Sequence, residues 1–345
     1  MQVIEYSKRR LNIEGTALIW PYLNRTKGDE VYELFLDNNA LLNINWYRKL
    51  PNEIKDKAII SADFTLKEQW LSNPEFQKEP LKRIKEFIQP LINEGAVFPE
   101  SYAENQANFL KNNDAELKAE WMTGYLYLIL LFRIFTAKKG DTLPERLLTT
   151  LRQKEVPRFG GLVILCTLAS YLKKHQNIQM LGDTKKAFSY IQGFVAAQPS
   201  KKNEVAGDMN YIRNRVGDIS LWLQPLALVQ KNYQFKGQMV IVTNDVPLKE
   251  FIMGCIPFVL SDDNSSVCAT FDHLRFDAVH SDVINTQILQ NTEWEINRSL
   301  VPTVNKRKQN ENLYNLKQHV MEKADDFLSS EVEKVWSVWF RDRFS

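Results

Sequence analysis

The chain has 345 residues, 44% of them hydrophobic, so it can bury one large core or two ordinary ones. Its formal net charge of +2 is too small to demand a nucleic-acid partner, while local basic patches stay open. No apolar run reaches the length of about 20 residues that a membrane span needs, and no signal peptide is visible. Together with three cysteines that share no metal-binding spacing (Cys166, Cys255 and Cys268), this predicts a cytoplasmic protein without membrane contact.

The first strong pattern is an apolar strand over Val31–Leu36 that stops at Asp37-Asn38-Asn39. These three residues favour turns and helix caps, and a helix is expected from Ala40 onward. Asp37 therefore lies at the carboxyl end of a buried strand, where open α/β sheets bind ligands. Its carboxylate either caps the next helix or holds something cationic, and both interpretations stay open here.

A second unit follows the same plan. The short apolar run Ala58–Ile60 predicts a strand, and Ser61 or Asp63 begins a helix over Phe64–Leu71. Glu68 lies one turn inside this helix. Most helical glutamates face solvent, so an inward role for Glu68 needs support from the rest of the chain.

Residues 74–200 are expected to be almost wholly helical, with a clean apolar stripe over Leu81–Leu91. Two longer apolar helices, 116–135 and 162–174, suit the interior of a bundle. Asp114, Glu116 and Glu120 lie near a helix start, where the helix dipole by itself favours acidic residues.

The last third of the chain brings two further carboxylates. After a polar linker at 199–207 comes a helix in which Asn214 and Asp218 share a face. Met239–Val242 is then an apolar strand running into Thr243-Asn244-Asp245. Short strands are expected at 256–260 and 267–271, and one amphipathic helix at 312–340, preceded by a basic triplet at 306–308.

Four carboxylates thus follow strand ends or helix starts: Asp37, Glu68, Asp218 and Asp245. In a parallel sheet these positions share one edge, so the side chains are expected to converge. Like charges held close together repel unless a cation is present, and hard ions such as Mg²⁺ or Mn²⁺ prefer oxygen ligands. Such ions activate water and stabilise a phosphoryl group in transit.

The residues resemble the PIN-like nucleases, a family of metal-dependent ribonucleases that includes many toxin components. The family's opening strand ends in Asp-Thr-Asn, where this chain has Asp37-Asn38-Asn39, and its last motif is Thr-x-Asp, as in Thr243-Asn244-Asp245. Its glutamate and third acid correspond to Glu68 and Asp218. The motifs cover 31–72 and 208–260, under a third of the chain.

The resemblance implies an α/β fold with a three-layer PIN-like core and a mostly parallel central sheet. The core would comprise 1–73 and 201–290, with a helical insertion at 74–200 and an amphipathic helix within 291–345. The four acids would bind Mg²⁺ or Mn²⁺, with Asn38, Asn39, Thr243 and Asn214 around them and Arg213 and Arg215 as phosphate contacts.

Four points stay open. Asn38 replaces the family's hydroxyl residue, and Glu116 or Glu120 competes with Glu68 for the second acidic position. The leading hypothesis is an RNA phosphodiesterase. The alternatives are a structure-specific DNA nuclease and a non-catalytic scaffold that binds a regulatory protein or another copy of itself. A histidine–aspartate group around His273 and His280 matches no strong metal template.

Overall fold

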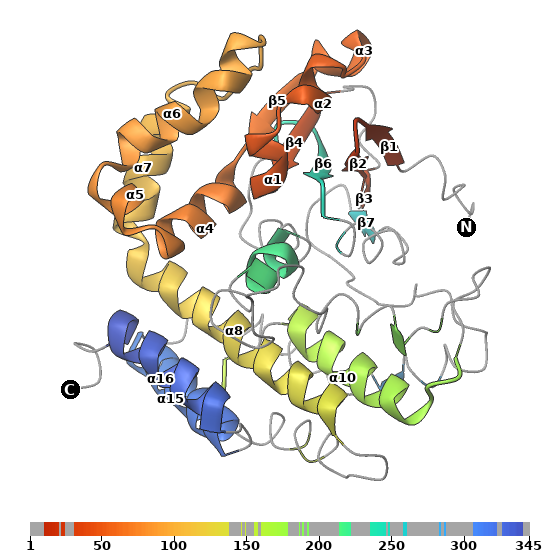
Figure 1. Cartoon of the computed structure of the whole chain (residues 1–345), viewed down its shortest axis with the longest axis vertical. Helices are drawn as coiled ribbons and strands as arrows, with labels where there is room; N and C mark the ends of the chain where they lie inside the picture. The colour runs from red at the N-terminus through yellow and green to blue at the C-terminus, as the bar shows by residue number, and fades with distance from the viewer. Residues whose placement is uncertain are drawn as a thin grey trace. The chain divides into compact units, whose positions relative to one another are not determined.

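The computed structural model describes residues 10–20, 22–24, 31–137, 155–157, 160–178, 214–221, 235–245, 258–260, 306–322 and 326–340, with some single positions between them. The chain divides into two compact units (Figure 1). The first comprises Met1–Leu117 and Gly217–Ala269, and the second comprises Lys118–Val216 and Thr270–Ser345. The predicted insertion at 74–200 therefore begins in the first unit and ends in the second.

The first unit is built on a five-stranded sheet in the order β1-β2-β6-β4-β5. Its strands are β1 (Arg10–Ile13), β2 (Thr16–Ile19), β4 (Tyr32–Leu36), β5 (Ala58–Ser61) and β6 (Gln238–Thr243). β4 pairs in parallel with both β5 and β6, while β2 runs antiparallel to β1 and to β6. Four strands therefore share one direction, which confirms an α/β fold with a mostly parallel sheet.

The central strand β4 is buried, as its apolar sequence predicts. Its register places Leu36 opposite Val242 of β6 and Phe35 opposite Ser61 of β5. Side chains from Leu34 to Leu36 are fully buried, as expected for a strand covered on both faces. β4 and β6 are also adjacent at their first residues, because a Cβ on Gly237 would lie 2.2 Å from the Val31 carbonyl oxygen.

Two smaller β elements complete the strands. The β1–β2 turn holds Glu14 and Gly15 at φ values of 50° and 79°, the two positive values that a tight hairpin turn requires. β3 (Tyr22–Asn24) pairs in parallel with β7 (Phe258–Leu260) as a separate two-stranded sheet. β7 lies within the strand predicted at 256–260, whereas 267–271 is outside the described residues.

Short helices connect the strands of the first unit: α1 (Asn38–Leu42), α2 (Asn45–Arg48) and α3 (Asn52–Lys55) lie between β4 and β5, and α4 (Asp63–Ser72) follows β5. α5 (Pro74–Lys78), α6 (Pro80–Asn93) and α7 (Tyr102–Asn112) come next. The predicted stripe on α6 buries Ile84, Ile88 and Leu91, while Leu81 is 38% exposed.

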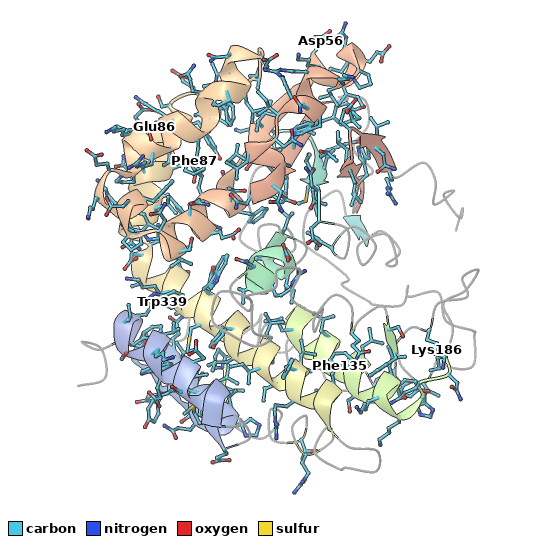
Figure 2. All side chains as sticks on the ribbon, in the orientation of Figure 1. Asp56, Glu86, Phe87, Phe135, Lys186 and Trp339 are labelled. Carbon is cyan, nitrogen blue, oxygen red and sulfur yellow. The ribbon has the colours of Figure 1, made fainter. Side chains whose placement is uncertain are left out.

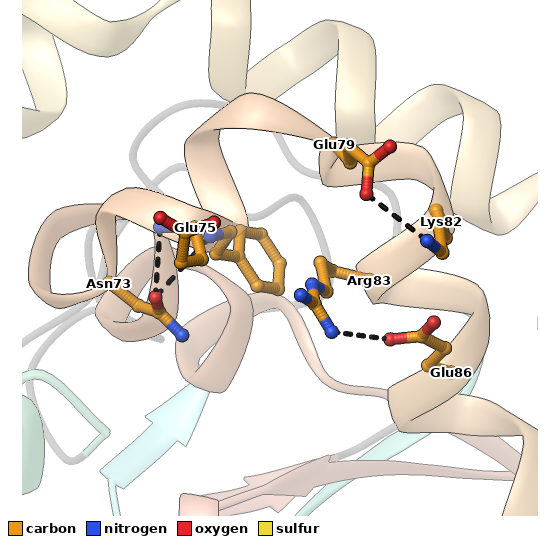
Figure 3. Close-up of polar contacts among 7 residues, drawn as sticks. Asn73, Glu75, Glu79, Lys82, Arg83 and Glu86 are labelled. Atoms are coloured by element: carbon orange, nitrogen blue, oxygen red, sulfur yellow. Dashed lines mark hydrogen bonds and ion pairs between the residues drawn. The ribbon is translucent and has the colours of Figure 1, made fainter.

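The start of α5 illustrates how local sequence sets these helices. Asn73 caps α5, because its side-chain oxygen accepts the backbone N–H groups of Glu75 and Phe76, and Pro74 occupies the first turn (Figure 3). On the exposed face of α6, residues three apart form ion pairs. One example is the pair between Arg83 and Glu86 at 2.9 Å (Figure 3).

The second unit is helical where it is described. Helix α8 (Asp114–Thr136) begins in the first unit and continues here, followed by α10 (Gly160–Lys174). α8 is buried on all sides from Trp121 to Leu131, which explains its unbroken apolar sequence. Near its end, the ring of Phe135 lies 5.1 Å from that of Phe188 (Figure 2). No described helix is long and apolar enough to cross a membrane.

The carboxyl-terminal segment differs from the sequence prediction. Instead of one helix over 312–340, the structure has two, α15 (Lys306–Met321) and α16 (Asp326–Phe340). They pack as a hairpin: Lys317 pairs with Glu333 at 2.7 Å and lies 4.8 Å from the ring centre of Trp336. The apolar spacing continues across the break, so periodicity alone cannot locate it.

Candidate functional site

The carboxylate of Asp37 joins three elements at the carboxyl edge of the sheet. Its Oδ1 accepts the Ala40 N–H at 2.9 Å, which makes Asp37 the N-cap of α1. Its Oδ2 accepts the hydroxyl of Thr243, the last residue of β6, and, at 3.1 Å, the N–H of Asn244, the next residue. The capping interpretation left open by the sequence is therefore confirmed. The same carboxylate also links the end of β4 to the end of β6.

Burial sets the electrostatics of this carboxylate. Asp37 is 8% exposed, and removal from water raises its pKa although hydrogen bonds to Thr243, Ala40, Asn244 and Asn39 act in the opposite direction. A carboxylate offers about four lone-pair positions, so these bonds leave little of its accepting capacity unused. A cation beside Asp37 would favour the charged form that burial disfavours.

Asp245 lies at the same edge and is linked to Asp37 through Thr243. The Thr243 hydroxyl donates to Asp37 and accepts the Asp245 N–H at 2.9 Å. Asp245 Oδ1 in turn accepts the Leu248 N–H at 2.6 Å. Asn244 directly precedes Asp245, and its Oδ1 is buried and finds no donor among the described residues. Asn244, which the sequence analysis passed over, thus adds an oxygen suited to a hard cation.

Helix α4 is fastened to the carboxyl end of β4 by two polar side chains that the sequence analysis did not single out. The Thr65 hydroxyl donates to the Leu36 carbonyl at 2.9 Å, and Gln69 donates to Asn38 Oδ1 at 3.2 Å. Their spacing of four residues on one helical face is the signal that could have indicated this contact. Glu68 lies between them along α4 and is half-buried.

Glu68 contacts the helix that contains Asp218. A Cβ added to Gly217 would lie 3.1 Å from Glu68 Oε2 and 3.3 Å from its Cδ, so the carboxylate rests against the backbone of helix 214–221. Asp218 is the next residue and is half-buried. In the same helix, Asn214 is exposed and Arg215 is half-buried, while Arg213 lies outside the described residues.

The described contacts place Asp37 and Asp245 at the β4–β6 edge and Glu68 against helix 214–221, which contains Asp218. Within the described ranges, no three His, Cys, Asp or Glu side chains are grouped closely enough to hold a metal ion. The donor chemistry suits Mg²⁺ or Mn²⁺, because the atoms available are carboxylate and amide oxygens. The single four-acid cluster expected from the sequence does not appear among these residues.

The competing acids have other surroundings. Asp114 Oδ1 accepts the indole N–H of Trp70 at 2.9 Å, and Glu116 is exposed in the first turn of α8. Glu120 belongs to the second unit. For Glu68, the described contact is with Gly217, the residue before Asp218.

A hydrogen-bonded group that the sequence analysis did not identify orders the end of β5. The Tyr102 hydroxyl donates to Asp63 Oδ1 at 2.6 Å and accepts the Ala62 N–H at 2.7 Å, while Gln106 donates to the same carboxylate oxygen at 2.9 Å. Burial first, and then the charge of Asp63, raise the pKa of Tyr102 well above its ordinary value, so the phenol stays a donor. Because Tyr102 lies 39 residues after Asp63, no local pattern predicts this pair.

A surface groove of about 640 Å³ lies on α5, α6 and α7. None of the four predicted acids lines it. It contains Lys78, Lys82 and Lys85, whose ion pairs with Glu75, Glu79 and Glu104 measure 2.6, 3.2 and 2.7 Å. Its charges are therefore largely balanced, and exposed pairs of this kind are weak. The groove is not a candidate for the site.

The remaining sequence features are accounted for briefly. Cys166 is a free, buried thiol, and burial raises its pKa, whereas Cys255 and Cys268 lie outside the described residues. So do His273 and His280. The basic triplet begins α15, and Lys308 forms an exposed ion pair with Glu155 at 3.1 Å.

Comparisons with protein-family models, with curated proteins and with solved structures found no match. The resemblance to PIN-like nucleases thus rests on the residues quoted above, and a function must be argued from the geometry of the chain itself.

Proposed function

We propose that the protein is a metal-dependent phosphodiesterase acting on nucleic acid, RNA in preference to DNA. The observation that carries the proposal is the adjacency of β4 and β6: two parallel strands, each followed by an aspartate at the same edge and linked through Thr243. The attachment of α4 by Thr65 supports it, because the helix that contains Glu68 is thereby held at the end of β4.

The residues divide into two functional groups in this proposal. Asp37, Asn244 and Asp245 would hold Mg²⁺ or Mn²⁺ at the sheet edge, and Glu68 and Asp218 would complete the site as substrate binds. The bound ion would lower the pKa of a water molecule and stabilise charge on the phosphoryl group. Asn38, Asn39, Thr243 and Asn214 would orient these acids, as Thr243 already does through its hydrogen bonds with Asp37 and Asp245.

Phosphate recognition is assigned to Arg213 and Arg215, which precede Asp218. A guanidinium binds a phosphate through two parallel hydrogen bonds, and this suits a diester next to a metal site. The RNA preference is carried over from the family resemblance.

A Mn²⁺ titration combined with a cleavage assay tests the proposal. Wild-type protein should bind Mn²⁺ by calorimetry and cleave a labelled single-stranded RNA, and EDTA should abolish cleavage. Asp245→Asn and Glu68→Gln should each remove cleavage, whereas the matched variants Glu116→Gln and Glu120→Gln should retain it. If one of the matched variants removes cleavage and Glu68→Gln retains it, the second acid has been assigned wrongly.

A second candidate function, a non-catalytic scaffold that binds a regulatory protein or another copy of the chain, is favoured by a specific observation. Asp37 accepts structural hydrogen bonds from Ala40, Thr243 and Asn244. Within the described ranges, no group of three His, Cys, Asp or Glu side chains could hold a metal ion. If wild-type protein shows no heat of Mn²⁺ binding at millimolar concentration and no cleavage, the scaffold replaces the nuclease as the better explanation.

A further inference from the structure

Gly217 stands out in helix 214–221 because a helix interior is an unfavourable place for glycine. Relative to alanine, glycine there costs about 1 kcal/mol in helix propensity. Its φ is ordinary, since the positive glycine φ values that the structure gives belong to Gly15 and Gly95. The backbone conformation therefore does not require glycine at this position.

What requires a small residue is the carboxylate of Glu68. A Cβ on Gly217 would lie 3.1 Å from Oε2, 3.8 Å from Oε1 and 3.3 Å from the carbon between them. All three are close to van der Waals contact or inside it, so the whole carboxylate group lies against one bare backbone carbon. The glutamate side chain is flexible and can move aside, so a methyl group at 217 would displace the carboxylate without preventing folding.

We propose that Gly217 is a positioning residue: its missing side chain lets Glu68 approach the helix backbone directly beside Asp218 and makes Glu68 the acid that completes the metal site with Asp218. This inference rests on the proposed function. It also explains how Glu68 takes the second acidic position, since its carboxylate contacts helix 214–221.

The displacement should affect metal binding more than stability. Moving a side chain that orients a metal site typically weakens metal affinity by 10–100-fold. We expect Gly217→Ala to lower Mn²⁺ affinity by about 10-fold. In EDTA its melting temperature should stay equal or rise, because alanine favours the helix. A purely structural role for Gly217 would lower both quantities together.

Gly124 in α8 provides a matched control. A Cβ there would lie 3.1 Å from Val216 Cγ1, the same distance as at Gly217 but against a stiff apolar side chain. Gly124→Ala should therefore lower the melting temperature and leave Mn²⁺ affinity unchanged. A third comparison places Gly217→Ala in a Glu68→Ala background, where the methyl group meets no carboxylate and should cause no further loss of affinity.

Calorimetric Mn²⁺ titration of the full chain, paired with melting curves in EDTA, separates the outcomes. Weaker binding by Gly217→Ala at undiminished stability, absent in the Glu68→Ala background, is the expected result. Equal affinity of wild type and Gly217→Ala overturns the inference and leaves the proposed function standing, as does an equal loss in Gly124→Ala. No Mn²⁺ binding by wild type overturns the proposed function and this inference with it.

Discussion

The substitution Asp37→Asn separates the two roles of this residue. Asparagine has nearly the same shape but can accept at only one of its two terminal atoms. In wild type, Oδ1 accepts from Ala40, and Oδ2 accepts from Thr243 and Asn244. The Thr243 hydroxyl can rotate to accept from the new amide, but a backbone N–H cannot, so one buried backbone donor is left without a partner.

The expected size of this loss follows from that donor. An unsatisfied buried N–H costs about 1–3 kcal/mol. This corresponds to about 2–10 °C in melting temperature for a domain of ordinary size. Charge acts in the opposite direction, because the variant no longer buries a carboxylate whose pKa is raised by desolvation. The two effects can be distinguished because only the second depends on pH.

The sign of the pH dependence is fixed by the direction of the pKa shift. Since folding raises the pKa of Asp37 above 3.8, its ordinary value, the folded state holds the proton more tightly than the unfolded chain. The resulting stabilisation is complete below the unfolded pKa and is lost as pH rises through the folded pKa. The melting temperature of wild type minus that of Asp37→Asn should therefore be largest at acidic pH. This difference should shrink as the pH rises towards neutral.

Melting curves in EDTA from about pH 4 to about pH 8 measure this difference. Asp56→Asn, which removes the same charge at an exposed position, controls for the general effect of net charge. A difference that grows as pH rises would refute the reasoning, because it would mean that the fold favours the charged carboxylate. If the proposed function is right, Mn²⁺ binds the folded wild type and should raise its melting temperature, whereas the variant should show no such increase.

Three further predictions concern the framework around the site. Gly237→Ala should prevent normal folding in a thermal melt, because its Cβ would lie 2.2 Å from a backbone oxygen that cannot move aside; a wild-type melting curve would contradict the close approach of β4 and β6. Tyr102→Phe should destabilise by about 1–3 kcal/mol, equally across neutral pH, because its phenol stays protonated beside Asp63; a loss confined to alkaline pH would mean that the phenol ionises. Lys317→Ala should lower the melting temperature more than Glu333→Ala, because the lysine side chain is 7% exposed and the glutamate 52%; the reverse order would mean that the ion pair outweighs the packing of the lysine.

Local patterns in the sequence determined the central strands. The apolar runs before Asp37 and Asp245 have no polar alternation, which indicates strands buried on both faces, and such strands pair in parallel inside an α/β sheet. Both aspartates were therefore expected at one edge, and β4 and β6 are indeed neighbours. The capping ability of Asp37 was also readable, because a short acidic side chain before a helix is a local signal.

Tertiary structure alone decided what these acids contact. The Thr243 hydroxyl that binds Asp37 is 206 residues away in the chain, and the glycine against Glu68 lies in another late segment. Such contacts depend on strand register and on where a helix crosses its neighbour, and apolar periodicity specifies only which face is buried. The same limit explains the single helix expected over 312–340, since an apolar stripe continues across a break as readily as along one helix.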